Sequence, residues 1–132
     1  MAAGRLANKA CIVTGAGSGI GKATAIRFAE EGAKVLCVDL NPSTVKATVE
    51  EIFQAQGQAV AVAADISDRA QVQSFTQRCI ELYGSIDVLV NNAGVNLPSV
   101  FHEASDADID RTLDVNVKGT MYCAQAAIPQ ML

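Results

Sequence analysis

The sequence has no tryptophan, one histidine and few aromatic residues. It has no apolar run approaching the roughly 20 residues that span a bilayer, no cluster of Lys and Arg, and no Cys-x-x-Cys pair. These absences exclude a membrane-spanning helix, a basic nucleic-acid-binding surface and a zinc site of ordinary spacing. We therefore expect neither nucleic acid nor membrane as a partner, and no bound metal.

The 132 residues are 50% hydrophobic with a net charge of −4, so the chain can bury a core. Residues 1–9 lack the apolar segment of a secretory signal, and we expect a cytoplasmic protein. The four cysteines, Cys11, Cys37, Cys79 and Cys123, are irregularly spaced. We expect them to be buried, reduced thiols; a disulfide or a metal site is the weaker alternative.

Apolar runs alternate with amphipathic runs along the chain. The expected strands are 9–14, 34–39, 59–64 and 86–91; the expected helices are 20–31, 42–56, a third that starts after 67 or 68 and ends at 83, a short one after 105, and a long one over 112–131. Strands separated by helices predict a parallel sheet covered on both faces, with strand order 3-2-1-4. We predict an α/β fold, the first half of a Rossmann-type doubly wound sheet, in one domain of residues 1–132.

The most informative segment is the glycine-rich turn Thr-Gly-Ala-Gly-Ser-Gly-Ile-Gly at 14–21, between the first strand and the first helix. Such a turn brings backbone N–H groups to the positive end of a helix, a combination that binds phosphate. Gly15 would allow the tight turn, Gly19 the approach of a pyrophosphate, and Gly21 close contact between helix and strand. The spacing G-x-x-x-G-x-G differs from G-x-G-x-x-G, so the turn alone is a weak signal. The side chains expected to face the sheet from the first helix are Ile20, Ala23, Thr24, Ile26 and Phe28.

Asp39 strengthens the prediction of a nucleotide site. It ends the second strand, 18 residues after Gly21, where a carboxylate can accept hydrogen bonds from ribose 2′- and 3′-hydroxyls. The same carboxylate would repel a 2′-phosphate, and neither Ser18 nor Leu40 supplies a basic side chain to neutralise one. We therefore expect NAD rather than NADP. The alternative for Asp39 alone is a solvated cap of the helix that starts at Pro42.

Five elements follow one another in a particular order and spacing between residues 6 and 132. They are Thr14-Gly15-x-x-x-Gly19-x-Gly21, Asp39, Asp65-Ile66, Asn91-Asn92-Ala93-Gly94 and Asn116. In this combination the chain resembles the short-chain dehydrogenase/reductase family. The resemblance implies an NAD-dependent oxidoreductase, with hydride transfer between nicotinamide and a small-molecule secondary alcohol or carbonyl substrate. It also implies a homo-oligomer, either a dimer or a tetramer.

The resemblance implies roles for single residues as well. Asp65 would bond the adenine amino group, Asn91 would brace the sheet, and Asn116, in a distorted helix, would hold a water of a proton relay as the one catalytic residue present. The cofactor-binding residues would be Gly15, Ser18, Gly19, Ile20, Gly21, Asp39, Asp65, Ile66, Asn92, Ala93, Gly94 and Val115. Taken alone, Asp65 is as well explained as a helix-capping acid, 91–94 as a turn, and Asn116 as a polar residue bonding its own helix backbone.

The family's catalytic Tyr-x-x-x-Lys pair is absent. Asp87 follows Tyr83 by four residues, and Ala126 follows Tyr122. In the family this pair and a serine come after a fifth strand, which would lie beyond Leu132. We therefore expect the chain to be the N-terminal, cofactor-binding half of a longer enzyme, inactive alone.

The last expected strand would be a sheet edge, and the long final helix would expose an apolar face, so we expect the isolated chain to be poorly soluble or marginally stable. The alternative function is a naturally short NAD-binding or sensor module without catalysis. A third alternative is a binder of another adenine nucleotide.

Overall fold

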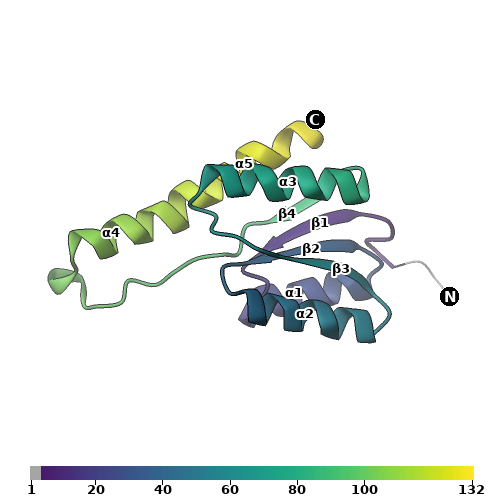
Figure 1. Cartoon of the computed structure of the whole chain (residues 1–132), viewed down its shortest axis with the longest axis horizontal. Coiled ribbons are helices and arrows are strands. Elements are labelled where there is room, and N and C mark those ends of the chain that lie inside the picture. The colour runs from purple at the N-terminus through teal and green to yellow at the C-terminus, as the bar shows by residue number, and fades with distance from the viewer. Residues whose placement is uncertain (1–3) are drawn as a thin grey trace.

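The structure is a computed structural model that describes residues 4–132. One four-stranded parallel sheet has the order β3-β2-β1-β4 (Figure 1). Its strands are β1 (Ala10–Thr14), β2 (Lys34–Asp39), β3 (Gln58–Ala63) and β4 (Val88–Val90). The predicted α/β fold and its strand order 3-2-1-4 are therefore confirmed. Residues 1–3 of the expected domain lie outside the described residues.

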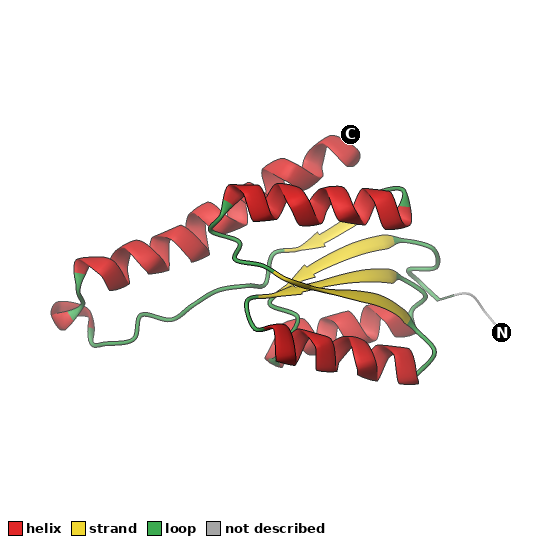
Figure 2. Cartoon of the chain, viewed as in Figure 1, coloured by secondary structure: helices red, strands yellow, loops and turns green. Residues whose placement is uncertain are grey.

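Helices cover both faces of the sheet (Figure 2). They are α1 (Gly19–Glu30), α2 (Pro42–Gln54), α3 (Arg69–Tyr83), α4 (Asp106–Leu113) and α5 (Thr120–Ala127), with short segments η1 (Phe101–Glu103), η2 (Asp114–Gly119, π-helical) and η3 (Ile128–Gln130). α1 and α2 lie on one face, and α3 and α5 on the other. None of the helices in the described part of the chain combines the length and apolarity needed to cross a membrane.

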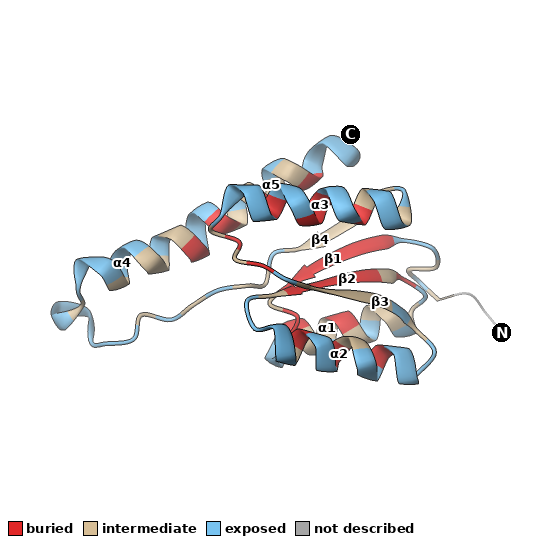
Figure 3. Cartoon of the chain, in the orientation of Figure 1, coloured by how far each residue is buried: buried red, intermediate tan, exposed pale blue. Residues whose placement is uncertain are grey.

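The sheet separates two apolar cores, and its central strands are the most buried part of the chain (Figure 3). Side chains alternate along β1: Ile12 faces α3 and α5, whereas Cys11 and Val13 face α1 and α2. This period of two is the geometry of a strand covered on both faces. All four cysteines are buried and unpaired, as predicted.

β4 is shorter than the predicted 86–91, and side chains bond the backbone just outside both of its ends. Asp87 Oδ2 accepts the N–H of Ala10 (2.8 Å) before the strand begins. After it ends, the Asn92 N–H donates to both the Val90 carbonyl and the Thr14 hydroxyl, each at 3.1 Å. The second helix ends at Gln54 instead of 56, and Gln56, with φ 66°, takes the left-handed position after it.

The two helices predicted at the end of the chain are one continuous helical run over 106–130, in which η2 joins α4 to α5. The residues that it buries recur every four positions: Val115, Gly119, Cys123 and Ala127. The exposed face carries Leu113, Val117, Met121 and Ile128. As predicted, an apolar face of this helix is therefore exposed.

The inward face predicted for α1 is confirmed only in part, because Ile26 and Phe28 are half-buried against the core but are not the fully buried residues of the helix. Its buried residues are Gly21 and Ala25, whereas Ile20 is 78% exposed. A Cβ on Gly21 would collide with the carbonyl oxygen of Gly15, so the helix lies against the end of β1 through its smallest residues. The close backbone contact expected at Gly21 is therefore present, and it orients the helix together with the packing of Ile26 and Phe28.

Candidate functional site

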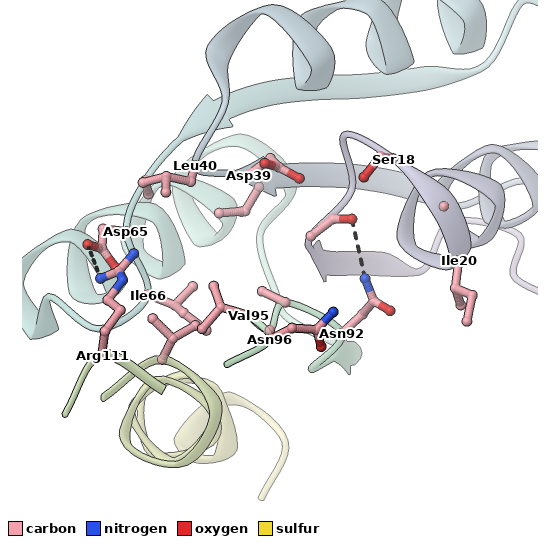
Figure 4. A pocket seen from close by; sticks show the side chains of 17 residues that line it. Ser18, Ile20, Asp39, Leu40, Asp65, Ile66, Asn92, Val95, Asn96 and Arg111 are labelled. Carbon is pink, nitrogen blue, oxygen red and sulfur yellow. Dashed lines mark hydrogen bonds and ion pairs between the residues drawn. The ribbon is translucent and has the colours of Figure 1, made fainter. Parts of the chain in front are cut away.

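A cavity of about 640 Å³ opens at the carboxyl ends of β1, β2 and β4 (Figure 4). All residues expected to bind a cofactor line it except Gly21, which is buried behind Gly15. Ligands in open parallel sheets bind at this edge. The lining residues not predicted from sequence are Val38, Leu40, Ala64, Val95, Asn96 and Arg111.

The glycine turn forms one wall of the cavity. Gly15 and Gly19 have φ values of 66° and 55°, which ordinary residues rarely adopt. A Cβ built on Gly19 would meet nothing within 4 Å, so this backbone faces open space. α1 starts here, and its N-cap Ser18 makes no capping hydrogen bond with its side chain. The first N–H groups of a helix have no intrahelical partners, so this wall carries hydrogen-bond donors and the positive end of a helix.

Asp39 is held between the glycine turn and the start of α2. Its Oδ2 accepts the N–H of Gly17 (2.9 Å), and its Oδ1 accepts the N–H of Asn41 (3.0 Å). The N-cap of α2 is Asn41, whose side chain accepts from Ser43 and Thr44. The capping alternative for Asp39 is therefore wrong, and the carboxylate is fixed at the cavity wall.

Asp65 lies on the loop between β3 and α3, at another part of the wall. Its Oδ1 accepts the backbone N–H (2.9 Å) and the hydroxyl (2.7 Å) of Ser67, and its Oδ2 accepts from Arg111 Nη1 (3.1 Å). Burial raises the pKa of Asp65, but the bonds from Ser67 and then Arg111 outweigh it and hold the pKa below its ordinary value. Asp68, and not Asp65, caps α3.

The segment 91–94 joins the end of β4 to the end of β1. The buried Thr14 hydroxyl accepts the N–H groups of Asn92 (3.1 Å) and Ala93 (3.0 Å). The Asn92 side chain donates to the carbonyls of Thr14 (3.1 Å) and Gly15 (3.3 Å). Asn91 instead donates to Thr120 O in α5 (3.3 Å), so the bracing expected of Asn91 is done by Asn92.

Asn116 lies in the π-helical η2, where a local helix distortion was expected. Its Oδ1 accepts the N–H of Val95 and its Nδ2 donates to the carbonyl of Val95, both at 2.8 Å. The Asn116 side chain thus bonds a distant loop. The alternative, in which it bonds its own helix backbone, is wrong. It does not line the cavity itself, but it fixes Val95, which does. Single π-helical turns often occur at functional sites.

Arg111 is the functional candidate that sequence reasoning missed. It lies four residues before Val115, so both fall on one side of the helical run and both line the cavity. That spacing was a usable signal, but a lone arginine on a helix is ordinarily a solvated residue. Residues 4–132 contain no cluster of three His, Cys, Asp or Glu side chains placed to hold a metal ion.

Comparisons with known proteins agree with this geometry. The family model described as short chain dehydrogenase matches residues 9–132. A subunit of (2S)-[(R)-hydroxy(phenyl)methyl]succinyl-CoA dehydrogenase from Thauera aromatica is 44% identical over 95% of this chain and 50% of its own. An NAD⁺-bound xylitol dehydrogenase superposes with a TM-score of 0.91 at 30% identity, covering 96% of this chain and 49% of that one. A metagenomic short-chain oxidoreductase in complex with NADP superposes with a TM-score of 0.89 at 32% identity, covering 95% of this chain and 57% of that one.

The chain spans about half the length of the curated relatives it matches. The family model nevertheless covers nearly all residues of this chain. The strand order, and the position of the cavity at the carboxyl ends of the strands, are those of a Rossmann-type fold. The chain belongs to the short-chain dehydrogenase family.

Proposed function

We propose that this chain is the cofactor-binding part of an NAD-dependent oxidoreductase that transfers a hydride between nicotinamide and a small secondary alcohol or carbonyl compound. The main observation in support of this proposal is that the glycine turn, Asp39, Asp65 and residues 92–94 all line one cavity. Its volume falls in the range of small-molecule sites, about 300–1,000 Å³. When bound, the cofactor would supply the hydride chemistry, and the chain's residues would bind and orient it.

In this proposal the glycine turn and the start of α1 hold the pyrophosphate, Asp39 the adenosine ribose, and Asp65 with Ile66 the adenine. Each Asp39 oxygen holds one backbone N–H and keeps a lone pair for a hydroxyl. The cation that lines the cavity, Arg111, is already paired with Asp65. A 2′-phosphate at Asp39 would meet an uncompensated negative charge, which favours NAD over NADP.

The cofactor assignment is tested with Asp39→Ala and calorimetric titration of NAD and NADP. We expect NAD binding to weaken by about 1–3 kcal/mol, the scale of lost hydrogen bonds to a charged group, and the discrimination against NADP to relax. Asp68→Ala is the matched control, because Asp68 also accepts two backbone N–H groups but lies outside the cavity lining. Unchanged affinities in Asp39→Ala would refute the assignment.

Asn116 is the one catalytic-site residue that we propose in this chain. It would hold the loop at Val95 and a water beside the reacting groups. The serine and the Tyr-x-x-x-Lys pair would have to come from elsewhere in a longer protein, with residues 1–132 the N-terminal part of one NAD(P)-binding domain. Such a protein would be a dimer or tetramer.

The intact mass of the native protein separates this proposal from a short NAD-binding module without catalysis. A mass near 13.8 kDa would favour the non-catalytic module. A mass roughly twice that would favour the dehydrogenase. Competition between NAD and ATP would then separate either one from a binder of another adenine nucleotide.

A further inference from the structure

Arg111 completes a closed ring of three side chains at the proposed adenine end of the cavity. Its Nη1 donates to Asp65 Oδ2 (3.1 Å) and to Ser67 Oγ (3.2 Å), and Ser67 Oγ donates to Asp65 Oδ1 (2.7 Å). Each member of the ring therefore contacts the other two. Arg111 comes from α4, 46 residues away from Asp65 in the sequence, so the ring joins two elements that the chain does not hold together locally. Figure 4 shows the Asp65 and Arg111 side chains side by side at one end of the cavity.

The ring sets the rotation of the Asp65 carboxylate. Ser67 holds only one oxygen of Asp65, Oδ1, through two hydrogen bonds. A carboxylate that is held by one oxygen can still rotate about its Cβ–Cγ bond. Arg111 holds the other oxygen, Oδ2. Because a carboxylate offers about four acceptor positions, the three bonds from Ser67 and Arg111 leave one, and the ring decides where that position points.

The same helical run is attached to the cavity rim a second time. Asn116 bonds both backbone groups of Val95, on the loop after β4. Arg111 and Asn116 therefore connect α4 and η2 to two separate segments of the wall, the loop before α3 and the loop after β4. Arg111 is 42% exposed at its side chain, so its bonds, and not deep burial, hold it in place.

We propose that Arg111 is a positioning residue for adenine recognition, which acts by aiming the Asp65 carboxylate into the cavity. This inference rests on the proposed function, because it takes Asp65 as the partner of the adenine. It assigns Arg111 a task distinct from pairing with the cofactor's phosphates: the guanidinium is engaged with Asp65 and Ser67 at the far side of the cavity from the glycine turn.

The test is calorimetric titration with ADP-ribose, which carries the adenine end without nicotinamide. The variants are Arg111→Met, which keeps an apolar stem of similar length, Asp65→Asn, and the double variant. We expect Arg111→Met to bind ADP-ribose about tenfold more weakly. The double variant should bind no more weakly than Asp65→Asn alone, because Arg111 acts through Asp65. Arg111→Lys should recover part of the loss, since it restores the charge but not the planar fork.

A pH series supplies a readout that a merely structural role would not change. Arg111 helps to lower the pKa of Asp65, so in Arg111→Met the acid loss of ADP-ribose binding should shift to higher pH. The other acids nearby, Asp68 on the same loop and Asp39 across the cavity, are the same in both proteins. Arg69→Met is the matched control: Arg69 also joins two distant segments, donating from α3 to Gln125 in α5 (2.6 Å), but does not line the cavity. It should bind ADP-ribose as the unchanged chain does.

Two results would overturn the inference while leaving the proposed function standing. One is wild-type affinity in Arg111→Met. The other is a double variant weaker than Asp65→Asn, since Arg111 would then contact the ligand directly. Absence of ADP-ribose binding by the unchanged chain would instead overturn the proposed function itself, and this inference with it.

Discussion

At the scale of single residues, the cavity is shaped by polar side chains that bind backbone groups of distant segments. Asp39 holds the glycine turn, Asn92 holds the end of β1, and Asn116 holds the loop after β4. Because loops have no hydrogen-bond ladder of their own, such contacts decide where their backbone lies. The described residues contain no buried side-chain N or O atom without a partner, so this polar framework is fully satisfied.

Thr14 tests that framework most directly. It is completely buried; its hydroxyl donates to Val90 O and accepts the N–H groups of Asn92 and Ala93. Thr14→Val keeps the shape but leaves the Ala93 N–H without a partner, whereas the Asn92 N–H keeps its bond to the Val90 carbonyl (3.1 Å). We therefore expect the free energy of unfolding to fall by about 1–3 kcal/mol. Thr14→Ser keeps the hydroxyl and should lose about 1 kcal/mol. Urea unfolding followed by circular dichroism measures both, and equal losses in the two variants would contradict this account.

At the scale of elements, two helices owe their placement to small residues and local distortions. α1 approaches β1 through Gly21 and Ala25. The last helical run approaches Ile66, on the loop before α3, through Gly119, and it shares a core cluster with α3 through Cys123. Gly119 also allows a close approach, because a Cβ there would meet the Ile66 side chain at 2.7 Å, whereas a Cβ on Gly21 would meet the backbone of Gly15. Close approach of a helix to its neighbours therefore needs glycine at these two points.

Gly21→Ala measures the cost of losing such an approach. The added methyl would meet the fixed backbone of Gly15 and the amide of Asn92, so we expect about 3 kcal/mol of lost unfolding free energy and weaker NAD binding. Gly84→Ala is the control: it has φ 82° but nothing within 4 Å of its Cβ, so it should cost only about 1 kcal/mol from backbone strain. If thermal and urea unfolding rank Gly84→Ala as the more damaging variant, the close-contact account of α1 is wrong.

At the scale of the whole molecule, all four thiols are buried in the described chain, whereas part of its apolar surface stays exposed to solvent. Burial raises the pKa of Cys37 to about 12 and those of Cys11, Cys79 and Cys123 to about 11. On the outside, the last helical run exposes Leu113, Val117 and Met121. Each feature has a measurable consequence for stability or solubility.

The buried thiols predict loss of stability in alkali. An unfolded thiol ionises near its ordinary pKa of 9.0, whereas the folded thiols resist ionisation up to about 11 or 12. Between pH 9 and the folded pKa values, the unfolded state holds fewer protons than the folded state, so the free energy of unfolding must fall as the pH rises. Below pH 9 the thiols are protonated in both states and leave the free energy of unfolding unchanged. A urea series from pH 7 to 11 would show this. Thiol reagent at pH 8 should react only after unfolding, and fast labelling of the folded chain would disprove the burial.

The exposed apolar face predicts self-association of the isolated chain, with low solubility or marginal stability. β4 has one strand neighbour, β1, among the described residues. The exposed face of the last helical run, with Val117 and Met121, is apolar. Val117→Lys with Met121→Lys should reduce association in sedimentation velocity. Phe53→Lys, at a residue of α2 that is more exposed than either of these, should reduce it less. A monodisperse monomer with cooperative unfolding of the unchanged chain would show the prediction to be wrong.

Much of the candidate site could be anticipated because its residues occupy the ends of strands. Asp39 and 91–94 each follow an apolar run, and parallel strands bring their carboxyl ends to one edge. The contact of Arg111 with Asp65 and the exchange of tasks between Asn91 and Asn92 could not be anticipated. Which of two adjacent amides turns inward, and which loop a helical arginine reaches, depends on contacts between segments dozens of residues apart.

The sequence by itself determined the α/β class, the strand order and the edge at which a ligand would bind, because hydrophobic periodicity and the handedness of crossovers are local rules that leave few topologies. The tertiary structure alone decided three further points: that Ile20 at the start of α1 faces away from the core, that the last helical segments are continuous through a π-helical turn, and that Arg111 meets Asp65. Each follows from close contact in space, where backbone clearance and paired charges outweigh the pattern of apolar side chains.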